Sequence, residues 1–501
     1  MSSSLDIATE DNELVADTDT PETPIPASIQ TTDFTDAAES YGTSDSQGLS
    51  DDPSPPRDYG LIRGVNIGGV FLIEPFIKPS LFDQFHNMSV EDMPVDEWTF
   101  TKTLGKEEAK RQLEDHWNTF VTKSHLEGLA DAGINWIRIP IGYWAFNLTS
   151  EEPYVDGQIP YIERILGWAR EIGLKVELDL HGAPGSQNGY DNSGRRGTPE
   201  WLLSRTNIDR TLDALTKMTS MVLDWDDVVY GIQILNEPSR WKWSVESIFG
   251  FYKEAYDLVR SIAPNVYFMI HDTFLGPNDW GTLVSSNWTN TLMDTHIYQM
   301  FDNYMVTINE TAHISMVAEM AQNVTKFDRG NTRVVVGEFS AATHDCTKYI
   351  NGLGRGSRWE GTLEGVDHPL CPFKQCSCTG DYGSDYKEFS ESYKAFLKGY
   401  VDAQLAIYDG ELMGWFYWNF RTEEAPEWDY LLGVDQGWIP KFPRTAYPMV
   451  PAYVPEEDSE QNTREENGSA NSAAPMLGSH PGYTLKSEAL VALLVLAVVF
   501  H

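Results

Sequence analysis

The chain has 501 residues, enough for two or three domains or for one large barrel with insertions. Its formal net charge of −39 argues against nucleic acid as a partner, because phosphates repel that charge, whereas a neutral polysaccharide is compatible with it. Aromatic residues are plentiful, with 16 Trp and 23 Tyr. Core packing accounts for many of them, and exposed indoles can also stack on sugar rings.

Residues 1–58 form an acidic segment that is rich in Ser, Thr and Pro. It holds fourteen Asp and Glu residues, and Arg57 is its only basic residue. Such a segment buries too little apolar surface to offset the entropy lost on ordering, so we predict a disordered arm. A specific docking tail is the alternative. The first thirty residues have neither the basic region nor the apolar region of a secretory signal peptide.

Between residues 59 and 452 the sequence alternates between short apolar runs and amphipathic stretches. Eight runs have the length and β-branched content of buried strands: Leu61–Ile67, Ile134–Pro140, Lys175–Leu180, Val229–Leu235, Val266–His271, Leu292–His296, Arg333–Gly337 and Met413–Trp418. Helical periodicity appears between several of them: Ser124–Ala132, Tyr161–Ile172, Glu246–Ile262, His313–Phe327 and Tyr386–Tyr408.

This alternation predicts an α/β fold, a single (β/α)8 TIM barrel that forms one catalytic domain over residues 59–452. About 390 residues is long for that fold. We therefore expect enlarged loops at three insertions: Pro75–Lys110, Gly182–Pro199 and Asp345–Gly383.

Two glutamates stand directly after or within the last residues of predicted strands. Glu237 follows the fourth run and Glu338 follows the seventh. A carboxylate beside a buried strand is costly unless it has a function, and active sites of this fold lie at the carboxyl ends of the strands. Pairs of carboxylates commonly cleave glycosidic bonds. We therefore predict that Glu237 and Glu338 are the catalytic pair.

Other ionisable and aromatic residues recur at the same ends of the predicted strands. For any one of them, a structural role is the simpler explanation. Their joint occurrence at one end of one barrel favours a functional site. They are Arg138, His181, Asn236, His296, Tyr298, Trp415 and Trp418.

The four cysteines are clustered: Cys346, Cys371, Cys376 and Cys378. Their spacing does not form two C-x-x-C halves, so two disulfides are favoured over a zinc site if the chain is secreted. Connectivity cannot be read from the sequence alone. We expect Cys346 to bond into the 371–378 group, and Cys376 and Cys378 not to pair with each other. Six N-x-[ST] sequons agree with secretion: Asn87, Asn147, Asn287, Asn309, Asn323 and Asn467.

The C-terminal region combines a polar linker over residues 453–488 with an apolar tail over residues 489–501. The tail is too short to span a bilayer. With the small residues that begin near Asn467, it fits the pattern of a GPI-anchor signal, and a short tail anchor or a buried helix is the alternative. A GPI anchor requires entry into the secretory pathway, so we expect a different natural N-terminus that carries the signal peptide.

The central part of the chain resembles glycoside hydrolase family 5, and within it the fungal exo-β-1,3-glucanases. The resemblance covers about residues 59–440. The motifs that carry it are Arg63–Gly69, Glu74-Pro75, Pro79–Phe82, Ile137–Pro140, His181–Gly189, Asn236-Glu237-Pro238, His296–Gln299, Gly337–Ala342 and Thr422–Trp428. Asn-Glu-Pro alone is moderately specific, and in order with the long His181–Gly189 loop it is strongly specific.

The resemblance implies a role for each matching position. Glu237 is the general acid/base, Glu338 the nucleophile, and Asn236 holds the sugar 2-hydroxyl. The other implied substrate-binding residues are Glu74 for the terminal glucose, Arg138, His181, His296 and Tyr298 as the shell, Trp418 under the sugar, and Tyr190 and Phe301 as an aromatic clamp. Val70, Tyr190 and the Asn419–Arg421 segment depart from the family's usual residues.

The expected reaction is retaining hydrolysis of β-1,3-glucan, with transglycosylation when a sugar hydroxyl replaces water. It needs an ionised Glu338 and a protonated Glu237, so we expect a raised pKa for Glu237. We expect no metal and no cofactor, a monomer, and a location in the cell wall or at the cell surface. The alternatives are a cellulase, mannanase or β-1,6-glucanase, and a weakly catalytic glucan-binding wall protein.

Overall fold

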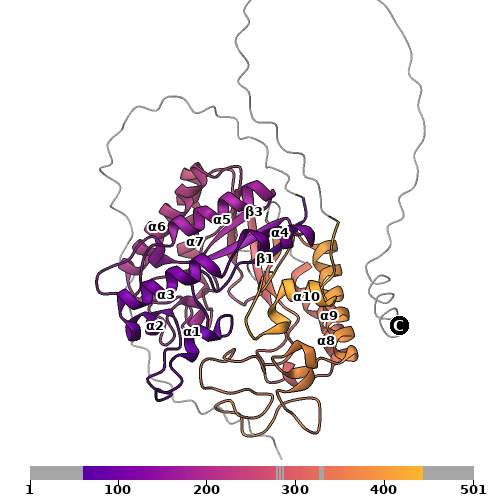
Figure 1. Cartoon of the computed structure of the whole chain (residues 1–501). Helices are drawn as coiled ribbons and strands as arrows, with labels where there is room; N and C mark the ends of the chain where they lie inside the picture. The colour runs from indigo at the N-terminus through magenta and orange to yellow at the C-terminus, as the bar shows by residue number, and fades with distance from the viewer. Residues whose placement is uncertain (1–59, 278–279, 281–283, 285–286, 326–331, 444–501) are drawn as a thin grey trace, which may run out of the picture. The chain divides into compact units, whose positions relative to one another are not determined.

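The computed structural model describes residues 60–443, apart from 278–279, 281–283, 285–286 and 326–331 (Figure 1). The predicted acidic arm, the polar linker and the apolar tail lie outside these residues. The last residues of the predicted catalytic domain, 444–452, also lie outside them. No helix in the described part of the chain combines the length and apolar character needed to cross a bilayer.

Eight parallel strands close into one barrel in the order of the sequence, which confirms the predicted (β/α)8 fold. All eight predicted runs form strands, with ends shifted by one or two residues. The strands are β1 (Ile62–Asn66), β2 (Trp136–Gly142), β3 (Lys175–Gly182), β4 (Val229–Gln233), β5 (Tyr267–His271), β6 (Thr291–Ile297), β7 (Arg333–Phe339) and β8 (Gly414–Tyr417).

Ten α-helices are present in the described residues, and most of them surround the barrel (Figure 1). They are α1 (Pro79–Asp83), α2 (Glu97–Leu104), α3 (Lys106–Thr119), α4 (Lys123–Asp131), α5 (Ile159–Ile172), α6 (Arg205–Ser220), α7 (Val245–Ile262), α8 (Glu310–Thr325), α9 (Glu391–Glu411) and α10 (Tyr430–Gln436). The five helices predicted from periodicity are all present. The described residues between β5 and β6 contain no α-helix.

The expected insertion Pro75–Lys110 is more regular than a loop, because it contains α1, α2 and the start of α3. Helix α3 buries Ala109, Leu113 and Trp117, which recur at the four-residue spacing of one helical face. The segment Asp345–Gly383 contains no α-helix in the structure and is a true loop.

Two disulfides stabilise that loop. Cys346 bonds to Cys378, as expected, and Cys371 bonds to Cys376. The first bond joins cysteines that are 32 positions apart, near the two ends of the loop. The second joins cysteines only five positions apart. The first bond therefore joins the two ends of the loop to each other.

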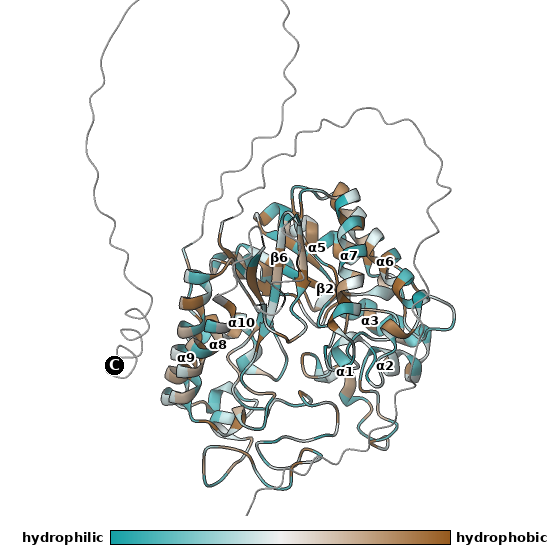
Figure 2. Cartoon of the chain, turned by 180° about the vertical axis from the view of Figure 1, so that it is seen from behind, coloured by the Kyte–Doolittle hydropathy of each residue, from teal (hydrophilic) through white to brown (hydrophobic). Residues whose placement is uncertain are grey.

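The barrel has an apolar end and a polar end. At the amino ends of the strands, buried side chains such as Ile62, Trp136, Leu292 and Phe416 form a small separate core. Gly64 is required there, because a Cβ would lie 2.1 Å from the Phe416 ring. The main core fills the space between strands and helices, and hydrophobic colour follows the strands in Figure 2. Polar side chains therefore collect at the carboxyl ends, where the fold places its active sites.

Candidate active site

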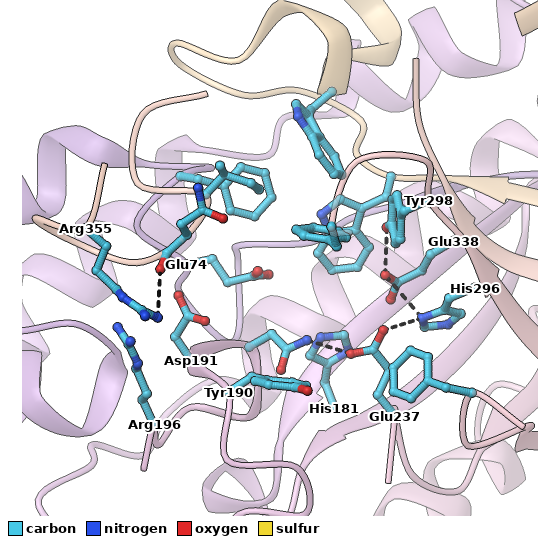
Figure 3. Close-up of a pocket in the computed structure, with 18 of the residues that line it drawn as sticks. Glu74, His181, Tyr190, Asp191, Arg196, Glu237, His296, Tyr298, Glu338 and Arg355 are labelled. Carbon is cyan, nitrogen blue, oxygen red and sulfur yellow. Dashed lines mark hydrogen bonds and ion pairs between the residues drawn. The ribbon is translucent and has the colours of Figure 1, made fainter. Parts of the chain in front are cut away.

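A cavity of about 510 Å³ opens at the carboxyl ends of the strands (Figure 3). Nine of the eleven side chains predicted for the site line it. The remaining two, Arg138 and Asn236, are fully buried beneath it. Arg138 bonds to Glu338, and the Asn236 side-chain nitrogen lies 3.3 Å from His181 Nε2. The fold thus brings these eleven residues together from separate strands and loops. Trp415, also at a predicted strand end, is instead buried in the core, where its indole N–H donates to Asp409 at 2.7 Å.

Glu338 lies near the end of β7 between two hydrogen-bond donors. Its Oε1 accepts from Arg138 Nη1 at 3.0 Å, and its Oε2 accepts from the Tyr298 hydroxyl at 2.9 Å. The preceding residue must be glycine, because a Cβ on Gly337 would lie 2.0 Å from Asp294 Oδ1. A register shift between β6 and β7 at this point sets His296 opposite Glu338. Local backbone irregularity therefore aims both side chains into the cavity.

Glu237 follows β4 with its backbone in the left-handed region, at φ 45°. This conformation is unfavourable for a residue with a side chain, and such strain is concentrated at functional sites. Its Oε1 lies 2.7 Å from His296 Nδ1, and its Oε2 accepts from Asn192 Nδ2 at 2.8 Å. The carboxylate is buried and fixed in position by both contacts.

His296 joins the two glutamates. Its Nδ1 is 2.7 Å from Glu237 Oε1 and 3.4 Å from Glu338 Oε2, so these two oxygens are at most about 6 Å apart. Its other nitrogen, Nε2, is 3.1 Å from Asp294 Oδ2. The imidazole therefore sits among three carboxylates, and Figure 3 shows it beside both glutamates.

Electrostatics in the site differ from our expectation. Burial alone would raise the pKa of Glu237, but the hydrogen bond and positive charge of His296, with His271 and Asn192, lower it to about 2. Burial raises the pKa of Glu338, although His296 and Arg138 oppose this. Burial disfavours the charge of His296, yet Glu338 and Asp294 raise its pKa well above the usual value. The expected raised pKa of Glu237 is therefore wrong, and the proton of this hydrogen-bonded pair rests on His296.

Arg138 is the centre of a buried network under the cavity. Besides Glu338, it donates to Asn66 at 2.9 Å and to the Asn236 carboxamide at 2.8 Å, and it pairs with Asp179 at 3.1 Å. Burial opposes its charge, but the surrounding carboxylates keep its pKa above the usual range. A permanently charged guanidinium therefore holds Asn236 and Glu338 in fixed positions.

His181 and Trp418 form one wall. Their rings stack at 5.5 Å with an angle of 15° between planes, and His181 Nδ1 is held by Asp179 at 2.6 Å. Trp418 is buried except for the surface that lines the cavity, and it follows β8. A flat indole of this kind presents one face to a bound ring.

The side of the cavity away from His296 carries charged side chains that the sequence analysis did not single out. Figure 3 shows Asp191, Arg196 and Arg355 there, with Glu74 between them and the catalytic candidates. Burial, and then the charges of Asp191, Glu338 and Glu237, raise the pKa of Glu74 well above its usual value. Its buried Oε1 has no hydrogen-bond partner among the described residues, so it can bond to a ligand.

Tyr190 and Phe301 lie at the mouth of the cavity. Their exposed fractions are 43% and 46%, which is high for aromatic side chains. Phe301 packs edge-on against Tyr298 at 5.5 Å. Both rings line the cavity, as a clamp at its entrance requires.

Sequence reasoning missed several residues that contact the predicted ones or line the same cavity. Asn192 and Arg196 lie in the predicted insertion Gly182–Pro199, and Arg355 lies in the predicted insertion Asp345–Gly383. Asp294 could have been found from the sequence. It lies two residues before His296 on β6, and residues i and i+2 of a strand point to the same face of the sheet.

One group of side chains in the described residues has spacing that suits a metal ion: Glu237, His271 and His296, whose ligand atoms lie within 4.8 Å of one another. Hydrogen bonds account for the group. Glu237 and His296 bond to each other, and His271 Nδ1 accepts from the Thr273 N–H at 2.9 Å. The neutral His271 then carries its proton on Nε2 and offers no lone pair, which fits a metal ligand poorly.

Comparisons with known proteins identify the family. The model of the cellulase family (glycosyl hydrolase family 5) matches residues 102–355. A probable glucan 1,3-beta-glucosidase A of Neosartorya fischeri is 41% identical over 374 residues, which cover 74% of this chain and 86% of the relative. A glucan 1,3-beta-glucosidase of Blumeria graminis is 40% identical over 76% of this chain and 87% of the relative.

The chain belongs to glycosyl hydrolase family 5. It is therefore a glycoside hydrolase, as the paired glutamates at the strand ends predicted. The fold agrees with solved structures. A rutinosidase from Aspergillus niger superposes with a TM-score of 0.58 at 18% identity, over 76% of this chain and 98% of that structure.

Proposed function

We propose that this glycoside hydrolase releases glucose from the non-reducing end of β-1,3-glucan with retention of configuration. The observation that supports the proposal best is the separation of at most about 6 Å between oxygens of Glu237 and Glu338. Retaining enzymes place their carboxyl groups about 5–5.5 Å apart, whereas inverting enzymes need about 6.5–9.5 Å for a water molecule.

Glu338 is the nucleophile in this proposal. It attacks the anomeric carbon, the bond to the leaving oxygen breaks, and a glycosyl-enzyme forms. Arg138 and Tyr298 donate to the carboxylate and favour its ionised form. Asn236, fixed by Arg138, can hold the sugar 2-hydroxyl, where hydrogen bonds strengthen in the transition state.

Glu237 is the general acid and then the general base. Before substrate binds, its proton rests on His296, 2.7 Å away. When substrate fills the cavity, water is excluded and the leaving oxygen becomes basic, so the proton passes from His296 Nδ1 through Glu237 to that oxygen. In the second step Glu237 accepts a proton from water or from an acceptor sugar, and the glycosyl-enzyme is resolved.

The charged side of the cavity supports attack at a chain end. Glu74 has a free buried oxygen for hydroxyls of a terminal sugar, and Asp191, Arg196 and Arg355 occupy the space where a chain would continue. A glucan that enters past Tyr190 and Phe301 would therefore stop after one sugar beyond the cleaved bond. One glucose would be released in each cycle.

The names of the relatives support the linkage. Proteins about 40% identical over most of this chain are named glucan 1,3-beta-glucosidases, so β-1,3-glucan is the proposed substrate. The family model is named for cellulases, which keeps a β-1,4-glucan as the second candidate. A cell-wall or cell-surface location, monomeric state and GPI anchoring of the C-terminal tail are also proposals, and the mass of the native C-terminus would test the last.

Product analysis on laminarin tests the proposed function. We expect glucose as the first and only early product, with slower action on carboxymethylcellulose, mannan and pustulan. Laminari-oligosaccharides as first products would contradict attack at the chain end. Faster action on another polymer would favour the alternative linkage, and tight laminarin binding with little turnover would favour a wall-binding protein.

A further inference from the structure

A pair of aromatic residues, the exposed Trp241 and the half-buried Phe274, adjoins the cavity and has no part in the roles given above. Trp241 lies in the loop after β4 and is 60% exposed, and its ring stacks on Phe274 at 5.2 Å and 24°. Both side chains line the same cavity as Glu237. A tryptophan that remains this exposed beside a binding cavity is an apolar surface available to a ligand.

The backbone holds this pair in place at some cost. Thr273 and Phe274 both have positive φ, at 57° and 61°, which is unfavourable for residues with side chains. Two hydrogen bonds fix them there: Thr273 N–H donates to His271 Nδ1 and Phe274 N–H donates to Asp272 Oδ1, both at 2.9 Å. Conformational strain of this kind persists where the surrounding structure enforces it, and it is concentrated at ligand sites.

The pair lies on the acid/base side of the cavity. The Phe274 ring contacts His271 at 5.0 Å, His271 contacts His296 at 4.5 Å, and His296 bonds to Glu237. Glu74, which is proposed to hold the terminal sugar, and Asp191, which is proposed to block the chain beyond it, lie on the side away from His296 (Figure 3). The leaving oxygen must lie beside the acid, so the departing chain extends toward the aromatic pair.

We propose that Trp241 and Phe274, with Arg240, form a binding platform for sugar residues of the departing glucan beyond the Tyr190–Phe301 clamp. The Arg240 guanidinium lies over the Trp241 ring, 5.1 Å from its centroid, so N–H donors adjoin the indole surface that remains exposed. This combination suits a neutral ring with hydroxyl groups at its edge and apolar C–H bonds on its face. The same platform receives the acceptor glucan in transglycosylation.

This inference rests on the proposed function for the direction of the chain, and substrate length tests it. The kcat/KM values of Trp241→Ala are measured on 4-nitrophenyl β-glucoside, laminaribiose and laminaritetraose. We expect the ratio of tetraose to aryl glucoside to fall about tenfold, the loss that removal of one aromatic contact produces. Trp241→Phe should restore most of the ratio. A ratio within twofold of the wild type would overturn the platform.

A matched control is available in Tyr304, which is 62% exposed but does not line the cavity. Tyr304→Ala should leave the ratio unchanged. If the ratio fell equally in Tyr304→Ala, loss of any exposed aromatic ring would produce the effect, and the platform would be refuted.

A binding measurement separates this inference from the proposed function. Laminaritetraose and cellotetraose are titrated by calorimetry into Glu338→Gln, with and without Trp241→Ala. Of the two tetraoses, one will bind more tightly. We expect Trp241→Ala to weaken the binding of that tetraose by about tenfold, whether or not the wild type releases glucose from it. Absence of glucose release by the wild type would refute the proposed function alone, and equal affinities of the two variants would refute the platform.

Discussion

At the scale of single residues, the site depends on how one proton is shared. His296 touches Glu237, Glu338 and Asp294, and its raised pKa keeps on it the proton that Glu237 would transfer as the proposed acid. Asn192 and Arg138 hold the two glutamates from the other sides. The two carboxylates therefore have different surroundings, and different surroundings are what assign acid and nucleophile roles to chemically identical groups.

Removal of the acid should be partly reversible by an added nucleophile. We expect Glu237→Ala to retain measurable turnover on an aryl glucoside with a good leaving group, because such a group departs without protonation. Azide should restore its rate by attacking the glycosyl-enzyme in the space left by the carboxylate. Steady-state rates with and without azide are the measurement. Glu338→Gln is the matched control and should be inactive with and without azide. If azide rescued only Glu338→Gln, the acid/base and nucleophile assignments would have to be exchanged.

The charge of Asp294 should set the alkaline limit of activity. Activity should fall at alkaline pH when the pair of His296 and Glu237 loses its shared proton. Asp294 helps to keep that proton in place, because it raises the pKa of His296. Asp294→Asn removes a negative charge, the pKa of His296 falls, and the proton is lost at lower pH. We expect the alkaline limb of kcat/KM to move down by about one pH unit.

The acid limb provides the internal control for this variant. It reports Glu338, whose pKa burial raises above its ordinary value of 4.5, so activity should fall below a pH somewhat higher than 4.5 in both proteins. An alkaline limb that stays in place in a folded Asp294→Asn protein would contradict the role of His296 as proton carrier.

At the scale of elements, the disulfide-bonded loop between β7 and α9 shapes the charged side of the cavity. It carries Arg355, which lines the cavity, and Arg358, which pairs with Asp345 at the base of the loop. The Cys346–Cys378 bond closes this segment over 32 residues. The loop therefore supplies cavity-lining groups from a segment that contains no α-helix or strand.

Loss of that disulfide should weaken substrate binding more than turnover. In a Cys346→Ser/Cys378→Ser variant, we expect KM for laminaribiose to rise several-fold with a smaller change in kcat, and the free energy of unfolding to fall by up to about 3–4 kcal/mol, as chain entropy predicts for this span. Cys371→Ser/Cys376→Ser opens only a five-residue hairpin and is the matched control. Equal effects of the two double variants on KM would contradict the positioning role.

Particular residues show what the sequence could predict. The eight strands were readable because β-branched runs bury both faces, and Glu237, Glu338 and His296 were readable because they end such runs. Helix α3 was readable from Ala109, Leu113 and Trp117 but was taken for part of an insertion.

Other features depend on contacts between distant parts of the chain. Asn192 reaches Glu237 across 45 positions, and Arg138 reaches Glu338 across 200. The low pKa of Glu237 follows from His296 on a different strand. Such features appear only once the barrel has closed.

At the scale of the whole molecule, the barrel separates stability from function. The amino end is closed by an apolar core, and the carboxyl end holds buried charges whose desolvation is offset by mutual hydrogen bonds. The cavity is lined by charged side chains on the side away from His296, by the two glutamates beside His296, and by the aromatic pair next to His271. This order matches a glucan that enters with its terminal sugar first and leaves one sugar shorter.

The central claim is that Glu237 and Glu338 are close enough to act on one sugar in two displacements. Proton NMR during the first minutes of laminaribiose hydrolysis shows which anomer of glucose is released from the non-reducing unit before mutarotation. We predict the β anomer, because two inversions at the anomeric carbon retain its configuration. Release of the α anomer would mean a single displacement by water and would contradict the account.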